Sequence, residues 1–141
     1  MNSLFWSRLH GGMTHFPIAL ILAAFLFDAL SFLLHHPSPK QRDFSVTGYW
    51  LTVLGALGSL GAVFSGLALS KWKIGGTGLL LRHHLFVWPA FALIIGLATW
   101  RFLIRNQPTP RGFAIYLSVM AIACGLIGTA GFFGGEILLG R

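Results

Sequence analysis

Of the 141 residues in this chain, 55% are hydrophobic and only 9% are charged, whereas about a quarter of the residues in a soluble domain are usually charged. The net charge of +7 does not indicate nucleic-acid binding, because the lysines and arginines lie in short segments between long apolar blocks, where they anchor helix ends to lipid headgroups. Composition therefore excludes a soluble protein and a nucleic-acid partner, and it predicts one membrane-embedded domain over residues 1–141.

Four apolar blocks follow one another along the chain. Each is near the roughly 20 residues that cross the hydrocarbon core of a bilayer as a helix. In lipid the backbone must satisfy its own hydrogen bonds, so each block is expected to be helical. The predicted fold is all-α, an integral membrane four-helix bundle, with spans over residues 13–34, 46–70, 84–104 and 112–135.

Four crossings return the chain to the side on which it begins, here called side A, and the opposite side is called side B. The lysines and arginines divide equally between the two sides, so the positive-inside rule predicts no absolute orientation. Side A has Arg8, Lys71, Lys73, Arg82 and Arg141, and side B has Lys40, Arg42, Arg101, Arg105 and Arg111.

Ionisable residues from three of the predicted helices gather at side A. Such residues at membrane depth are costly, and where they occur they usually mark a functional site. We therefore expect the site at this end of the bundle. Its candidate residues are His10, His15, His83, His84 and Glu136.

Asp28 lies thirteen residues beyond His15, toward side B, and faces either the bundle or water. Two interpretations remain open for it: a proton-handling group, or a helix-end carboxylate near Lys40 or Arg105.

Similar features recur along the chain. Glycines of the second predicted helix return in the fourth after 70 positions, and His15 returns as His84 after 69. This pattern predicts two similar hairpins around a pseudo-two-fold axis along the membrane normal. The first and third helices then lie diagonally opposite, so that His15 and His84 face each other. The repeated glycines are Gly55, Gly58 and Gly61, and Gly125, Gly128 and Gly131.

This arrangement suits haem b. Two neutral imidazoles ligate the iron from opposite helices, and glycines let the other two backbones approach a flat macrocycle. We predict His15 and His84 as axial ligands, with His10 and His83 as substitutes or hydrogen-bond partners, and basic side chains of the A-side loop near the propionates. The further cofactor-binding positions are Gly58, Gly61, Gly128 and Gly131, and the basic ones are Lys71, Lys73 and Arg82.

Other interpretations of the same residues remain open. Glycines spaced in this way also serve plain helix packing, without any cofactor. If Gly11 and Gly12 break the first helix, His10 folds back and a site for zinc, copper or non-haem iron becomes available. That site would comprise His10, His15, His84 and Glu136.

The stretch from His10 to Leu20, His-Gly-Gly-Met-Thr-His-Phe-Pro-Ile-Ala-Leu, resembles the opening of a bacterial membrane family of the domain-of-unknown-function 2231 type. That family begins with His-Pro-x-x-Val-His-Phe-Pro. Its ending resembles Gly134–Leu138, Gly-Gly-Glu-Ile-Leu. Gly11 departs from the usual Pro, and the His-Gly that often follows the ending is absent here. The resemblance implies four spans, a histidine at the head of the third helix, and the bacterial inner membrane.

These observations predict a small cytochrome b-like subunit rather than a stand-alone enzyme. It would move electrons between a quinone or redox protein and a larger membrane complex. The alternatives are a cofactor-free accessory subunit and a protein with a His/Glu metal site. The three acidic residues lie at separate places, which argues against a Ser-His-Asp or paired-carboxylate site.

Overall fold

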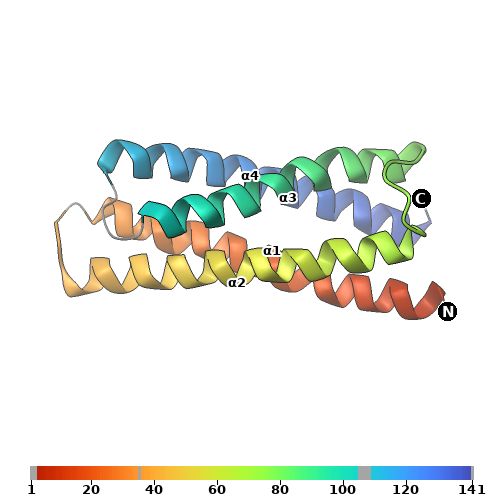
Figure 1. Ribbon diagram of the computed structural model, residues 1–141, viewed down its shortest axis with the longest axis horizontal. Helices are drawn as coiled ribbons and strands as arrows, with labels where there is room; N and C mark the ends of the chain where they lie inside the picture. Colours follow the sequence, from red (N-terminus) through yellow and green to blue (C-terminus); the bar gives the residue numbers. More distant parts are fainter. Residues whose placement is uncertain (1–2, 35, 105–108, 141) are drawn as a thin grey trace.

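The computed structural model describes residues 3–34, 36–104 and 109–140, and within these residues the regular structure is entirely helical. Each of the four helices is long and apolar enough to cross a membrane, which confirms the predicted membrane four-helix bundle (Figure 1). The helices are α1 (Ser3–Leu33), α2 (Pro39–Leu69), α3 (Gly78–Ile104) and α4 (Pro110–Leu139).

The helices begin before the predicted spans. α1 starts ten residues earlier and runs without interruption through Gly11 and Gly12, so His10 is a helical residue. α2 and α4 each begin at a proline behind a capping side chain, that of Ser38 or Thr109, which accepts a backbone N–H of the first turn. An apolar run marks only the part of a helix that lies in hydrocarbon, and these additional turns lie beyond it.

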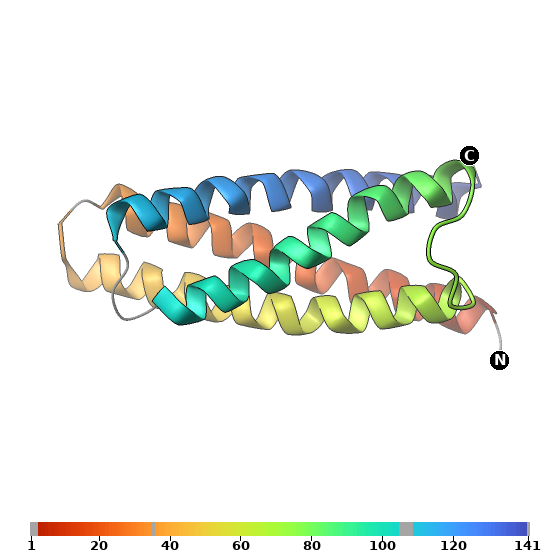
Figure 2. The ribbon, with the colours of Figure 1, turned by 45° about the horizontal axis from the view of Figure 1, so that its top comes forward.

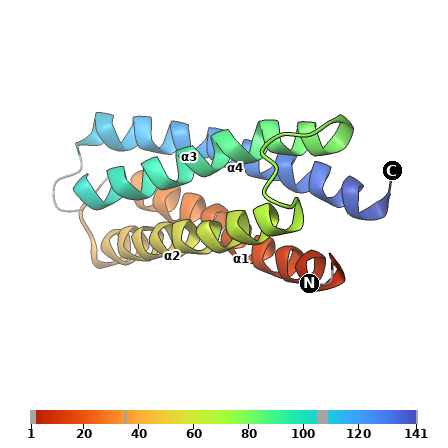
Figure 3. The same cartoon turned by 45° about the vertical axis from the view of Figure 1, so that its right-hand side comes forward.

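α1 and α2 form one hairpin and α3 and α4 form the other (Figures 1 and 2). α1 also packs on α4 and α2 on α3, whereas within the described residues the pairs α1–α3 and α2–α4 do not pack. The predicted diagonal placement of the first and third helices is therefore confirmed. α3 runs obliquely across the bundle in Figure 2. Side A carries the start of α1, the end of α4 and the connector 70–77 (Figure 3).

The buried face of α3 repeats that of α1 at a displacement of 73 positions. The buried acid of α1, Asp28, corresponds in this way to Arg101, the buried base near the end of α3. The half-buried His10 corresponds by the same displacement to the half-buried His83. The matching buried pairs are Pro17 and Ala90, Ile21 and Ile94, Ala24 and Leu97, and Asp28 and Arg101.

The buried face of α4 repeats that of α2 at a displacement of 68 positions, not 70. An error of two residues turns a helix by about 200°, which exchanges the inner and outer faces. Gly125 and Gly128 are accordingly exposed, and they correspond to the exposed Leu57 and Leu60. The matching buried pairs are Gly48 and Tyr116, Thr52 and Met120, Gly55 and Ala123, and Ser59 and Ile127.

The glycines of α2 serve helix packing. A Cβ atom on Gly55 would lie 2.7 Å from Ile21 Cδ1, and one on Gly58 would lie 3.4 Å from Pro17 Cβ. Gly61 likewise faces the methyl group of Met13. These positions let α1 lie close against α2.

An ion pair buried near side B joins all four helices. Arg101 of α3 donates from Nη2 to Asp28 Oδ1 at 3.0 Å and to the Ser45 carbonyl of α2 at 2.9 Å. The Tyr116 hydroxyl of α4 donates to Asp28 Oδ2 at 3.0 Å and lies 3.2 Å from Thr52 Oγ1. Arg101 is only 1% exposed, and Asp28 and Tyr116 are fully buried. The acid therefore faces the bundle interior.

This cluster corrects two predictions. Arg101 is not a headgroup anchor, and the partner of Asp28 is Arg101 rather than Lys40. Arg105, the other predicted partner, lies outside the described residues. Tyr116 is also buried, although a tyrosine near the end of a membrane helix is typically found at the membrane interface. Each correction has the same cause: helix rotation, which decides whether a side chain near a helix end faces the interior or the lipid.

Candidate functional site

A half-open cavity of about 530 Å³ lies between the four helices toward side A. All four histidines predicted for the site line it: His10 and His15 from α1, and His83 and His84 from α3. Most of the remaining wall is apolar. It includes Ile18, Val63, Leu67, Leu80, Val87, Phe91, Ile94, Ile127, Ile137 and Leu138.

The predicted glycines are distributed differently. Gly131 lines the cavity, whereas Gly58 and Gly61 lie in the contact between α1 and α2. Gly128 is exposed, and a Cβ atom built on it would meet nothing within 4 Å. Among these four positions, the structure therefore brings only Gly131 to the histidines.

His10 and His83 are held in equivalent ways by the second helix of their own hairpin. His10 Nδ1 lies 3.1 Å from the Ala62 carbonyl of α2, and His83 Nδ1 lies 2.9 Å from the Ala130 carbonyl of α4. The two alanines are 68 positions apart, as the repeat requires. A carbonyl only accepts, so each Nδ1 carries the proton, and Nε2 of the neutral ring keeps a free lone pair.

Two glycines make room for these rings. A Cβ atom on Gly66 would lie 2.8 Å from His10 Cε1, and one on Gly134 would lie 3.3 Å from His83 Cε1. Gly66 and Gly134 are also 68 positions apart and line the cavity. The sequence contains this signal as a repeated Ala-x-Phe-x-Gly, at residues 62–66 and 130–134. A motif this short becomes recognisable as a signal only once the contacts of His10 and His83 are known.

Gly66→Ala is therefore expected to lower the free energy of unfolding by about 1–3 kcal/mol, because the added methyl group displaces the His10 ring. Gly128→Ala is the matched control, since its methyl group enters open space and gains about 0.5–1 kcal/mol from the lower backbone entropy of alanine. Reversible unfolding in detergent measures both changes. Equal effects of the two substitutions would contradict the close contact between the His10 ring and Gly66.

His15 and His84 are held differently. His15 is exposed, and its Nδ1 lies 2.5 Å from the Gly11 carbonyl one turn earlier in its own helix. His84 is buried, and its Nδ1 lies 2.6 Å from the carbonyl oxygen of Gly75, in the connector that follows α2, and 3.0 Å from the Gly75 backbone nitrogen, whose N–H can donate to it. Gly75 has a φ of 103°, a left-handed conformation that glycine adopts without strain.

His10, His15 and His83 thus share one pattern, from which His84 differs because its Nδ1 also lies against a backbone N–H, that of Gly75. Each Nδ1 lies against a backbone carbonyl, and within the described part of the chain no Nε2 takes part in a hydrogen bond. A carbonyl on the second ring nitrogen is the usual support of a histidine that ligates a metal ion. The cavity therefore presents imidazole lone pairs inside largely apolar walls.

The alternative His/Glu metal set is not assembled in this structure. Among residues 3–34, 36–104 and 109–140, no three His, Cys, Asp or Glu side chains are grouped closely enough to hold a metal ion. Glu136 is absent from the described cavity lining. His10 and His15 also remain about 140° apart on an unbroken helix, because Gly11 and Gly12 are helical.

Trp88 of α3 also lines the cavity, although tryptophan is typical of membrane interfaces. Its Nε1 is buried without a hydrogen-bond partner, the one such side-chain nitrogen or oxygen in the described residues. The Trp88 ring lies 6.2 Å from the His84 ring, centroid to centroid. An indole N–H only donates, so this part of the wall lacks an acceptor.

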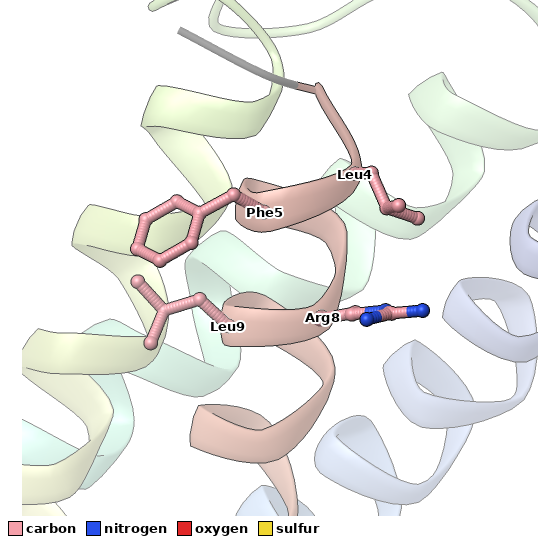
Figure 4. Close-up of a pocket in the computed structure, with 4 residues that line it drawn as sticks. All are labelled: Leu4, Phe5, Arg8 and Leu9. Carbon is pink, nitrogen blue, oxygen red and sulfur yellow. The ribbon is translucent and has the colours of Figure 1, made fainter.

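A second hollow of about 450 Å³ lies at the first turns of α1 (Figure 4). Leu4 and Arg8 project from one side of the helix there, and Phe5 and Leu9 project from the other. All four side chains are exposed and belong to one helix. We therefore place the candidate site in the cavity between the helices.

The profile of a family described as "Predicted membrane protein (DUF2231)" matches residues 7–139. No curated protein and no solved structure matches the chain.

Proposed function

This chain belongs to the family of predicted membrane proteins (DUF2231), and from that premise we propose that it is a small b-type cytochrome-like electron-transfer subunit. In this proposal the cavity near side A holds haem b between α1 and α3. The haem supplies one-electron exchange between the ferric and ferrous states. The protein supplies the axial ligands and surroundings that exclude water.

The arrangement of His10 and His83 carries this proposal. They lie on diagonally opposite helices, line the same cavity, and are related by the 73-position repeat. Each Nδ1 faces a carbonyl, which leaves two free Nε2 atoms of the kind that haem iron accepts axially. Haem needs only two protein ligands, so a third nearby ligand is not required.

The size and polarity of the cavity agree with a cofactor of this class. Its volume of about 530 Å³ falls within the roughly 300–1,000 Å³ typical of ligand sites. The walls are largely apolar, and burial in such surroundings is one of the properties by which a protein tunes a haem. We therefore propose His10 and His83 as the axial pair in place of the pair inferred from the 69-position spacing, His15 and His84; the support is that the second helix of each hairpin holds these two rings.

Few of the described residues lie outside the helices, so they form no second domain that could carry another redox centre. In this proposal the electrons therefore come from other molecules. The connectors between the helices are only a few residues long. We propose the bacterial inner membrane as the location, with a membrane quinone or a partner redox subunit as donor and acceptor. Contact with lipid follows from the four membrane-spanning helices.

An absorption spectrum tests the proposal. Protein purified in detergent from cells with adequate haem supply is expected to show a Soret band and, after dithionite, a sharp α band, with about one haem per chain. A colourless protein from such cells, which also fails to bind added hemin, would overturn the proposal.

One observation favours a second candidate, a cofactor-free accessory subunit. Gly96, Gly125 and Gly128 are exposed on α3 and α4, and a Cβ atom on any of them would meet nothing within 4 Å. Exposed small residues of this kind allow close packing of a further membrane helix. This candidate predicts a colourless protein that still assembles with its complex when all the histidines are replaced.

A further inference from the structure

The connector between α2 and α3, residues 70–77, begins with a sharp reversal of the chain at side A (Figure 3). Lys71 and Trp72 have φ values of 55° and 62°, in the left-handed region that residues other than glycine rarely adopt. The Trp72 N–H donates to the Leu67 carbonyl at 2.7 Å, which closes the turn around the end of α2. The Trp72 side chain therefore lies beside α2 instead of continuing beyond its end.

An aromatic band runs from the start of α1 across α2 to this connector. The ring centroid of Trp72 lies 5.7 Å from that of Phe64 in α2, and Phe64 lies 6.4 Å from Trp6 in α1. Trp6 in turn lies 5.5 Å from Phe5. Phe64 is 56% exposed although it belongs to the membrane-spanning helix α2, so the band faces lipid. Tryptophan in such a position is typical of the level at which hydrocarbon meets the lipid headgroups.

Two lysines lie at the connector end of this aromatic band. Lys71 and Lys73 flank Trp72, both are exposed, and within the described residues neither forms an ion pair. The next residue, Ile74, is 76% exposed. The segment 71–74 thus combines two ammonium groups with two exposed apolar side chains at the membrane interface. The phosphate of a lipid is complementary to the ammonium groups, and its acyl chains can cover the apolar side chains.

The charges of side B form a weaker surface for an anion. Arg101, one of the basic residues of that side, is buried in the ion pair with Asp28. Arg42 is followed directly by Asp43, which is exposed and of opposite charge. The connector at side A contains no acidic residue. Charge complementarity therefore favours this connector as the surface that meets an anionic headgroup.

We propose that the connector at side A binds the headgroup of an anionic phospholipid. Lys71 and Lys73 contact its phosphate, and Trp72 and Ile74 lie against its acyl chains. A basic residue close to an anionic leaflet contributes about fivefold to the affinity. Residues 71–74 are absent from the described lining of the cavity, so this inference does not depend on the proposed function.

Competition between two lipids tests the inference. The purified full-length protein in detergent is mixed with equimolar phosphatidylglycerol and phosphatidylcholine that carry the same acyl chains, and native mass spectrometry measures the ratio of the two complexes. The wild type is expected to retain phosphatidylglycerol in excess. Lys71→Gln combined with Lys73→Gln is expected to lower the ratio by about fivefold for each lysine.

Two double variants serve as controls for this measurement. Lys40→Gln combined with Arg42→Gln removes the same charge at side B and is expected to keep the wild-type ratio. Lys71→Arg combined with Lys73→Arg keeps the charge of the connector and should also keep the ratio. Equal losses in the side-A and side-B glutamine variants would overturn the inference, because lipid binding would then follow net charge alone. A wild type without preference for phosphatidylglycerol would also overturn it and would assign the connector to an acidic segment of a partner protein.

Discussion

His10→Ala and His83→Ala are each expected to abolish haem binding, whereas His15→Ala and His84→Ala retain it. Loss of an outer partner of a metal ligand costs roughly 10–100-fold in affinity, and loss of the ligand itself is expected to cost more. His10 and His83 are the two histidines held by the partner helix of their own hairpin, with Nε2 free. The ratio of haem to protein, from the pyridine haemochrome spectrum, measures the effect.

Two further variants sharpen this experiment. His36→Ala is the control, because His36 is exposed in the connector at side B, far along the bundle from the cavity. Ser65→Ala removes the hydroxyl that lies 3.1 Å from His10 Nδ1 and is expected to weaken haem binding without abolishing it. If His15→Ala and His84→Ala lose the haem while His10→Ala and His83→Ala keep it, the axial pair is the one inferred from the 69-position spacing.

Asp28→Asn is expected to lower the free energy of unfolding by about 3–5 kcal/mol, because it leaves the buried Arg101 guanidinium without a counter-charge. Both side chains are nearly inaccessible, so solvent does not screen the loss. The ion pair also links α1 to α3, and these two helices do not pack on each other elsewhere in the described residues. Unfolding of the purified protein in mixed detergent micelles with increasing SDS measures the change.

Two comparisons separate the ion pair from a general effect of substitution. Asp43→Asn changes an exposed acid of α2 and is expected to stay within about 0.5 kcal/mol of the wild type. Asp28→Asn combined with Arg101→Met contains no buried charge and should recover more than half of the loss. A double variant as unstable as the sum of the single variants would show that the two side chains act independently.

The side-A histidines show how much of a site can be predicted from a sequence. Their positions at the start of two predicted spans were sufficient to place them at one end of the bundle, and the structure has all four around one cavity. Which histidine of α1 is equivalent to which histidine of α3 could not be predicted from the sequence. His15 and His84 have matching places relative to the apolar blocks, but His10 and His83 have matching contacts.

The repeat was visible in the sequence with the wrong displacement. The glycines of α2 and α4 align at 70 positions, yet the faces repeat at 68, while those of α1 and α3 repeat at 73. A glycine in a membrane helix fits both a close helix contact and a lipid-facing surface. Residue identity alone therefore cannot assign Gly58 to the first use and Gly128 to the second.

By itself, the sequence determined the number of membrane helices, their order and the end at which the histidines gather. These follow from the length of apolar runs against the fixed thickness of a bilayer, which is a local property of the chain. Only the tertiary structure decided that Arg101 turns inward to Asp28 and that Trp88 lacks an acceptor. An arginine near a helix end reaches headgroups equally well by extending outward, and the choice depends on the rotation of each helix against partners as much as 73 residues away.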